Sequence, residues 1–219
     1  AGFDLDWRDP RFAQLIGDSY LETGDAANAL NYYQRGVGAN SEHLGNKMGM
    51  LRARIASANP PGDAETQIKE AKEMMGSPRV QALVRVTEAE FLVGQGKLDE
   101  AAEAANAAVQ ADATYPWSYA TLASIHARKG EFEETAKQYE KAIEADAYIG
   151  AFYFAAASTL AQAENADGAI AFMEKYPLKR DDRFLVNYGN MLQMLGRLDD
   201  ALARYDEAIE ANQVNADAY

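Results

Sequence analysis

The chain has 219 residues, of which 48% are hydrophobic and 25% are charged, a composition typical of a folded protein rather than a disordered one. Its formal net charge of −13 disfavours nonspecific binding to nucleic acids and favours basic or neutral partners. The absence of cysteine excludes disulfides and thiolate metal sites, and it is equally compatible with the cytoplasm and with the bacterial periplasm. No apolar run reaches the roughly 18 residues that a membrane-spanning helix needs.

Residues 1–9 alternate apolar and polar side chains in the stretch GFDLDW, which predicts an extended leader. This leader either covers the exposed end of the first helices or docks in the groove of another molecule. Asp9 followed by Pro10 is typical of a helix N-cap and the first helical residue, so we expect the helical part to begin at Pro10. The sequence begins with Ala1 rather than Met, and we therefore expect a processed chain or a fragment of a longer one.

A helix-like phrase recurs along the rest of the chain. It reads GDAANALNYYQRGVGANS from Gly24, GKLDEAAEAANAAVQADA from Gly96, GEFEETAKQYEKAIEADA from Gly130 and GRLDDALARYDEAIEANQ from Gly196. The spacing from Gly96 to Gly130 is 34 residues, and self-similarity at such a period predicts a repeat architecture. Extending the period predicts six repeats and the start of a further repeat or cap, with the ranges 10–44, 45–81, 82–115, 116–149, 150–181, 182–215 and 216–219.

Each repeat is predicted to contain two helices, because apolar residues recur at intervals of three and four both before and after the marker glycine. Leu122 and Ile125 precede Gly130, for example, and Phe132 and Tyr139 follow it. The glycine suits a left-handed C-cap, and the acidic residues after it suit the N-terminus of the next helix. The two helices are therefore expected to fold back on each other as a hairpin.

The period and the distribution of small and large residues resemble the tetratricopeptide repeat, a 34-residue helix–turn–helix unit. Its pattern has small residues at the eighth, twentieth and twenty-seventh positions, which in this chain hold Gly17, Ala29, Gly36, Ala89, Ala101, Ala108, Ala123, Thr135, Ala142, Ala157, Ala169, Gly189, Ala201 and Ala208. Bulky residues at the eleventh and twenty-fourth positions are Tyr20, Tyr33, His126, Tyr139, Leu160, Met173, Leu192 and Tyr205. The resemblance implies an all-α fold, a right-handed α-α superhelix (solenoid) of about six hairpins with a concave groove.

Two repeats depart from this pattern. In the second, Leu44, Met48, Leu51 and Ile55 form a helical stripe, but a longer turn with two prolines, ANPPGDAE, follows it. In the fifth, Tyr176 occupies a position for a small residue and Pro177 follows, so the second helix is predicted to end about one turn early.

The sequence contains no recognisable catalytic constellation. His43 and His126 lie in different repeats, His126 at a position expected to be packed in the core, and the glycines do not cluster as they do in phosphate-binding loops. The acidic run at Glu131, Glu133 and Glu134 lies at a helix start, where the helix dipole accounts for it. We therefore predict that the chain is not an enzyme and binds no metal or cofactor.

In the resembled family, partners lie along the concave face, against the first helix of each hairpin. Carried over by position, this implies a partner-binding surface made of Gln14, Asp18, Leu83, Val86, Glu90, Trp117, Ala120, Ser124, Arg128, Phe154, Ser158, Val186, Asn190 and Gln193. Trp117 and Phe154 either anchor a peptide or pack against neighbouring hairpins. The Lys and Asn pairs with which one subclass of the family grips acidic C-termini are absent, so an apolar or basic segment is the expected partner.

Basic residues cluster in two places. One cluster comprises Lys47, Arg52, Arg54, Arg79 and Arg85, and the other comprises Lys175, Lys179, Arg180 and Arg183. Each is expected to be either a solvated edge or a docking surface for an acidic partner.

The leading functional hypothesis is a scaffold for protein–protein interaction that holds a partner segment in its groove. Similar arrays serve bacterial envelope, secretion and polysaccharide-export assemblies. The alternatives are a self-assembling oligomerisation module and a regulatory domain of a larger enzyme or transporter.

Overall fold

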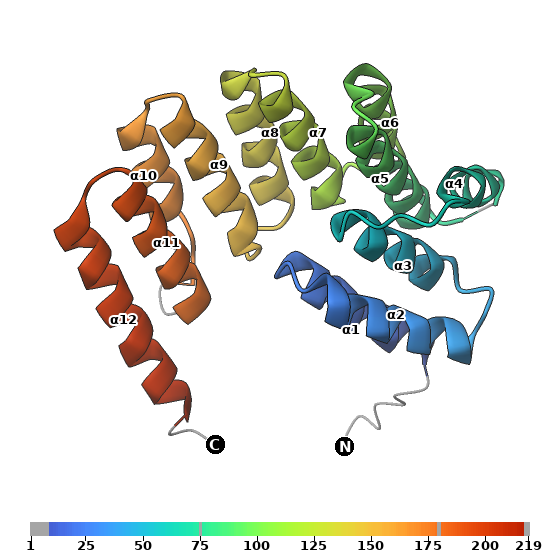
Figure 1. Ribbon diagram of the computed structural model, residues 1–219, viewed down its shortest axis with the longest axis horizontal. Helices are drawn as coiled ribbons and strands as arrows, with labels where there is room; N and C mark the ends of the chain where they lie inside the picture. Colours follow the sequence, from blue (N-terminus) through green and yellow to red (C-terminus); the bar gives the residue numbers. More distant parts are fainter. Residues whose placement is uncertain (1–8, 75, 179–180, 217–219) are drawn as a thin grey trace. The chain divides into compact units, whose positions relative to one another are not determined.

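A computed structural model describes residues 9–74, 76–178 and 181–216, with side chains up to Asn212. These residues form twelve α-helices and no strand (Figure 1), so the fold is an all-α helical-repeat solenoid, as predicted. The chain divides into two compact units, an N-terminal unit that ends at Ile125 and a C-terminal unit that begins at His126. The division falls within helix α7, and each unit is described separately below.

The N-terminal unit begins at the residue that the sequence predicts. It contains α1 (Pro10–Glu22), α2 (Ala26–Ala39), α3 (Leu44–Ala56), α4 (Ala64–Glu73), α5 (Pro78–Gly94), α6 (Leu98–Ala111) and most of α7 (Pro116–Arg128). Asp9 caps α1 by accepting a hydrogen bond from the backbone N–H of Arg11, and Pro10 is the first helical residue. The predicted leader lies on residues 1–8, outside the described part of the chain.

The C-terminal unit contains the end of α7 followed by α8 (Phe132–Ala145), α9 (Gly150–Gln162), α10 (Ala166–Glu174), α11 (Asp182–Met194) and α12 (Leu198–Ala216). Helix α10 has nine residues whereas α8 has 14, which confirms the early end predicted before Pro177. Tyr176 is buried there and packs against Phe184, with ring centroids 4.0 Å apart and ring planes tilted by 30°. Helix α12 continues through Ala216, so the residue at which a further repeat was expected to begin is still helical.

The turns inside the hairpins have the left-handed backbone conformation that the sequence predicts. The marker glycines adopt φ angles of +74° to +79° at Gly24, Gly96, Gly130 and Gly196. In the second and fifth hairpins the same conformation is held by Ala58 (φ 53°) and Glu164 (φ 59°), at a steric cost that glycine does not incur. The turn geometry is therefore kept even where its favoured residue is missing.

The pattern of small and large residues has a direct packing reason. A Cβ atom placed on Gly17 of α1 would lie 2.6 Å from the ring of Tyr33 of α2, and one placed on Gly189 of α11 would lie 2.4 Å from the ring of Tyr205 of α12. Both distances are far shorter than any carbon–carbon contact allows. The eighth residue of the first helix is therefore small so that the tyrosine of the second helix can lie against it.

The second hairpin does not follow this rule. The eighth residue of α3 is Leu51, which is 1% exposed, and residues 57–63 form a long connection before α4. Helix α4 packs mainly on α5 and makes few contacts with α3, so this hairpin is open. Helix α5 begins at Pro78, one turn before Ala82, the residue at which the sequence places the start of the third repeat.

Candidate functional site

The N-terminal unit contains a charged network that joins the first helices of its hairpins. Arg52 of α3 is 5% exposed and forms a bidentate ion pair with Glu90 of α5. Its Nε atom donates to Oε2 of Glu90 at 2.9 Å, and its Nη2 atom donates to Oε1 at 2.8 Å. Two parallel hydrogen bonds of this kind fix both the position and the orientation of the two side chains.

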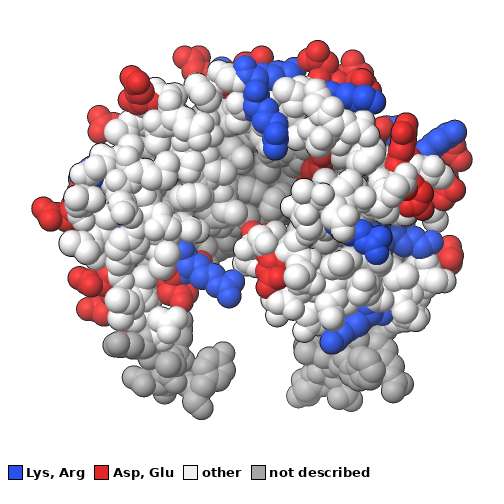
Figure 2. Space-filling model, viewed as in Figure 1, with Lys and Arg blue, Asp and Glu red and all other residues white. Residues whose placement is uncertain are grey.

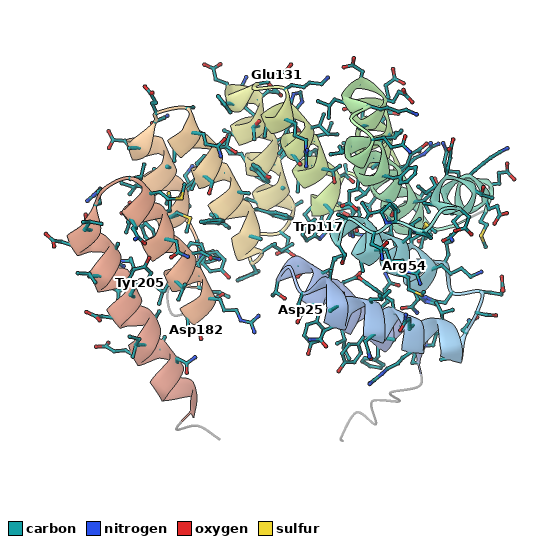
Figure 3. All side chains as sticks on the ribbon, in the orientation of Figure 1. Asp25, Arg54, Trp117, Glu131, Asp182 and Tyr205 are labelled. Atoms are coloured by element: carbon teal, nitrogen blue, oxygen red, sulfur yellow. The ribbon has the colours of Figure 1, made fainter. Side chains whose placement is uncertain are left out.

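Aromatic side chains surround the guanidinium of Arg52. Its central carbon lies 5.4 Å from the ring centroid of Trp117, the residue labelled on α7 in Figure 3, and its Nη1 atom donates to the hydroxyl of Tyr115 at 3.4 Å. Burial alone would lower the pKa of Arg52, but the Glu90 carboxylate raises it well above its ordinary value. The prediction that Arg52 belongs to a solvated edge or a docking surface is therefore wrong, because this cation is buried and already paired.

Asp18 of α1 lies near this network and is held by neutral donors. The hydroxyl of Tyr33 donates to its Oδ1 atom at 2.7 Å, and Nε2 of Gln14 donates to Oδ2 at 3.4 Å. Burial raises the pKa of Asp18, while the hydrogen bond from Tyr33 and the positive charge of Arg52 act in the opposite direction. Within the described part of the chain the carboxylate forms no ion pair, and the neighbouring Arg52 is bound to Glu90.

Three residues of the predicted surface are not accessible. Leu83 is 4% exposed and packs with Met48 and Leu51 of α3. Val86 is 0% exposed and lies beneath Trp117, and Ala120 of α7 is also buried. These side chains are buried because residues of α3 and α7 pack on this face of α5.

The two aromatic residues of the predicted partner-binding surface, Trp117 and Phe154, are half-buried and pack against other side chains. Trp117 packs against the cluster that contains Val86, and Phe154 of α9 packs against the core of the C-terminal unit. Of the other residues predicted on α7, Ser124 is half-buried and Arg128 is exposed at the end of the helix.

In the C-terminal unit the predicted residues form a neutral surface. Asn190 and Gln193 of α11 both accept hydrogen bonds from the hydroxyl of Tyr205, at 2.8 Å and 3.2 Å. Val186 is 42% exposed, and the buried Oγ atom of Ser158 has no hydrogen-bond partner among the described residues. None of these residues carries a charge, in contrast to Asp18 and Glu90 of the N-terminal unit.

The other basic residues are largely paired. Arg79 binds Asp112 at 2.9 Å, Arg85 binds Glu88 at 3.1 Å, and Lys47 lies 3.6 Å from Glu42. In the second cluster Lys175 lies 3.7 Å from Glu140 and Arg183 is exposed, whereas Lys179 and Arg180 lie outside the described residues.

The histidines have structural roles. His43 accepts a hydrogen bond from the backbone N–H of Asn46 and so caps α3, and His126 is partly exposed and pairs with Glu131 rather than lying fully in the core. Among the residues with described positions, no three His, Asp or Glu side chains gather as metal ligands. None of the helices in this part of the chain is both long and apolar enough to cross a membrane.

Comparison with models of known protein families identifies the repeat type. Models of the tetratricopeptide repeat match residues 10–43 and 121–183. The chain contains tetratricopeptide repeats. Neither match includes α3 and α4, the hairpin that departs from the repeat pattern. Tetratricopeptide repeat proteins are generally non-catalytic scaffolds for protein–protein interaction.

Solved structures support the same fold at low sequence identity. The thermophilic tetratricopeptide repeat protein TTC0263 of Thermus thermophilus is 16% identical with a TM-score of 0.56, and 91% of this chain covers 98% of that one. The pilF protein of Pseudomonas aeruginosa is 15% identical with a TM-score of 0.54, with coverage of 95% and 97%. A human IFIT1 dimer with PPP-AAAA is 16% identical with a TM-score of 0.67, and 96% of this chain spans about half, 52%, of that one. No curated protein sequence matches the chain.

Proposed function

We propose that this tetratricopeptide repeat protein is a scaffold that binds a basic segment of a partner protein on the first-helix surface of its N-terminal unit. The observation that carries the proposal is the carboxylate of Asp18. It lies partly buried, its hydrogen-bond donors among the described residues are neutral, and the neighbouring Arg52 is already bound to Glu90.

Charge counting supports a cationic partner group. The network holds two carboxylates and one guanidinium, so it carries one uncompensated negative charge when Asp18 is ionised. Burying that charge costs free energy, and a Lys or Arg side chain of a partner would recover part of the cost through a charge-assisted hydrogen bond. The net charge of −13 adds a long-range attraction for such a segment.

The surface available to the partner is smaller than the one predicted from the sequence. In the N-terminal unit it comprises Gln14, Asp18, Glu90 and the exposed edge of Trp117, because Leu83, Val86 and Ala120 are buried. The C-terminal unit has a separate neutral surface, which includes Val186, Asn190 and Gln193 and suits an apolar or polar segment.

Selection from a random peptide display library tests the proposal. We expect the selected peptides to be enriched in Lys or Arg, and Asp18→Asn to weaken their binding by about tenfold, the scale of one hydrogen bond to a charged group. Asp206→Asn, which removes an exposed charge from α12, is the matched control and is expected to bind as the parent protein does. Selected peptides without a cation, or equal binding by Asp18→Asn, would contradict the proposal.

Self-association is a second candidate, favoured by the exposed face of the last hairpin. Leu198, Leu202 and Ile209 of α12 are 60%, 60% and 56% exposed, and an open groove of about 540 Å³ lies between α11 and α12 beside Val186. Apolar residues gathered in this way are typical of an interface. Light scattering should then give a mass that rises with concentration and returns to that of a monomer in Leu202→Glu, whereas a concentration-independent monomer argues against assembly.

A further inference from the structure

The open second hairpin leaves a cleft between α2, α3 and α4, and its lining does not include Asp18, Arg52 or Glu90. The cleft has a volume of about 310 Å³, at the lower end of the range for ligand pockets. Its floor is formed by Met48 and Leu51 of α3 and Ala71 of α4, which are all buried. A cleft of this size accommodates a few side chains rather than a whole helix.

The cleft exists because α3 and α4 do not close on each other. In the first and sixth hairpins a glycine at the eighth position allows the second helix to approach, but α3 has Leu51 there. The connection through Pro60, Pro61 and Gly62 also replaces the tight turn of those hairpins. The space between α3 and α4 is therefore determined by the sequence of this repeat.

Adaptable apolar side chains form the walls of the cleft. Met50 of α3 and Val37 of α2 are half-buried, and Met74 at the end of α4 is 41% exposed. Methionine is unbranched and polarisable, and it is enriched on surfaces that bind varied apolar segments. This lining favours an apolar side chain of a partner over a polar ligand.

The charges at the rim of the cleft are mainly positive and favour an acidic partner. Lys47 and Arg54 line the cleft from α3 and are about two helical turns apart, and Glu70 of α4 is the one acidic residue of the described lining. Lys47 is loosely paired with Glu42 at 3.6 Å, whereas Arg54 makes no ion pair within the described part of the chain. Figure 3 labels Arg54 on α3, and Figure 2 shows basic side chains over the same part of the unit. This rim is positive in a chain whose net charge is −13.

We propose that this cleft binds a short amphipathic segment of a partner protein, which inserts apolar side chains between α2 and α4 and places a carboxylate on Arg54. The guanidinium can bind a carboxylate with two parallel hydrogen bonds, which fixes the register of the segment. The chemistry is the opposite of that at Asp18, so a single chain has two surfaces that select partner segments of opposite charge.

The test uses two synthetic helical peptides that differ in charge alone. Both carry leucines on one face, and the other face has glutamates in the first peptide and lysines in the second. Methyl NMR of the full chain with labelled methionines reports on the cleft directly, because Met48, Met50 and Met74 line it. We expect the glutamate peptide to shift these three signals and the lysine peptide to leave them unchanged.

Substitutions then test whether Arg54 determines the preference for the glutamate peptide. Arg54→Glu should weaken binding of the glutamate peptide by about tenfold or more, on the scale of a charge-assisted pair, and should admit the lysine peptide. Arg35→Glu changes a cation on α2 that lies over Tyr32 outside the cleft, and it should bind as the parent does. Circular dichroism checks that each variant is folded, and Asp18→Asn should leave this binding intact, so a failure of the first-helix site is distinguishable from a failure of the cleft.

Three results would overturn the inference. They are equal affinity for the two peptides, unchanged affinity in a folded Arg54→Glu variant, and methionine shifts confined to residues outside the cleft. Dodecanoate serves as a further probe, because a small anionic amphiphile has the same chemistry. Shifts with dodecanoate but not with the glutamate peptide would rule out a protein segment as the occupant.

Discussion

The second and sixth hairpins differ at two consecutive positions of their first helices. The eighth and ninth residues are Leu51 and Arg52 in α3 and Gly189 and Asn190 in α11. In the sixth hairpin, Gly189 makes room for the ring of Tyr205, and Asn190 accepts a hydrogen bond from the hydroxyl of the same tyrosine. Both positions therefore tie α11 to its own second helix.

In the second hairpin the same two positions serve contacts beyond the hairpin. Leu51 packs in a cluster that includes Leu83 of α5, and Arg52 forms its ion pair with Glu90 of α5. Helix α3 is thus attached more closely to the next hairpin than to α4. A repeat can lose its internal packing and keep its place in the array, and the space released within it becomes a candidate binding surface.

The largest effect is expected from Arg52→Ala. Removing one partner of a buried ion pair leaves Glu90 without its counter-charge, which is expected to cost about 3–5 kcal/mol in the free energy of unfolding. Urea denaturation measures this cost. The matched change in the sixth hairpin, Asn190→Ala, removes an exposed side chain and should cost about 0.5 kcal/mol or less.

A second substitution separates the charge effect from a loss of packing. Arg52→Ala combined with Glu90→Gln removes both charges, so part of the lost stability should return. If Arg52→Ala and Asn190→Ala have equal small effects, the second hairpin does not depend on its contact with α5.

Overpacking the sixth hairpin is expected to have the next largest effect. Ala201 of α12 is 2% exposed at a position where the helices lie close together, and Ala201→Leu should cost about 1–3 kcal/mol, because the core cannot take the larger side chain without displacement. Thermal unfolding measures the change. Ala203→Leu on the exposed face of α12 is the control, and a melting temperature unchanged in Ala201→Leu would contradict the assignment of the repeat positions.

Much of the fold could be predicted because the repeat imposes the same packing constraint several times. Gly17 and Gly189 each accommodate a tyrosine of the second helix, and this constraint is visible as a pattern of small and large residues in the sequence. The turn glycines, the cap at Asp9 and the short α10 follow from local rules in the same way.

The candidate site was less predictable because it depends on the repeat that breaks the pattern. Arg52 is the ninth residue of α3 and lies 34 residues after Asp18, the ninth residue of α1, but the predicted second repeat starts at Gly45 rather than Leu44 and so shifts this correspondence by one position. Burial of Leu83 and Val86 follows from how α3 and Trp117 lie on α5, which a position within a repeat does not specify. The Leu at position 51, where other repeats have Gly or Ala, was the signal in the sequence that could have revealed the open hairpin.

The pH dependence of stability should differ between the parent protein and Asp18→Asn. Burial raises the folded-state pKa of Asp18 above its ordinary value of 3.8, so the folded protein holds this proton more tightly than the unfolded chain does. Stability from this group is greatest below pH 3.8 and is lost as the pH rises through the folded-state pKa. The carboxylate of Asp18 faces Tyr33 of α2, Gln14 of α1 and Arg52 of α3. Their interactions with it lower its pKa and so limit the upward shift that burial causes.

Urea denaturation at a series of pH values measures this difference. Asn has no proton to lose, so the free energy of unfolding of Asp18→Asn relative to the parent should rise as the pH increases from below 3.8 to neutral. The equivalent residue of the sixth hairpin, Asn190, does not titrate, so it contributes no pH dependence to the free energy of unfolding. Parallel pH profiles for the parent and the variant would show that Asp18 is not desolvated.

The smallest effect is expected from exchanging the turn residues of the two hairpins. Ala58 has φ 53° in the second hairpin, where Gly196 has φ 74° in the sixth. A residue with a Cβ atom pays roughly 1–2 kcal/mol in this conformation, and glycine loses about 0.5–1 kcal/mol more conformational entropy on folding. Ala58→Gly should therefore stabilise the protein by about 0.5–1 kcal/mol, and Gly196→Ala should destabilise it by a similar amount. Opposite shifts in melting temperature would confirm that both turns are under the same backbone constraint, whereas a loss of stability in Ala58→Gly would mean that the open hairpin has relieved the strain at its own turn.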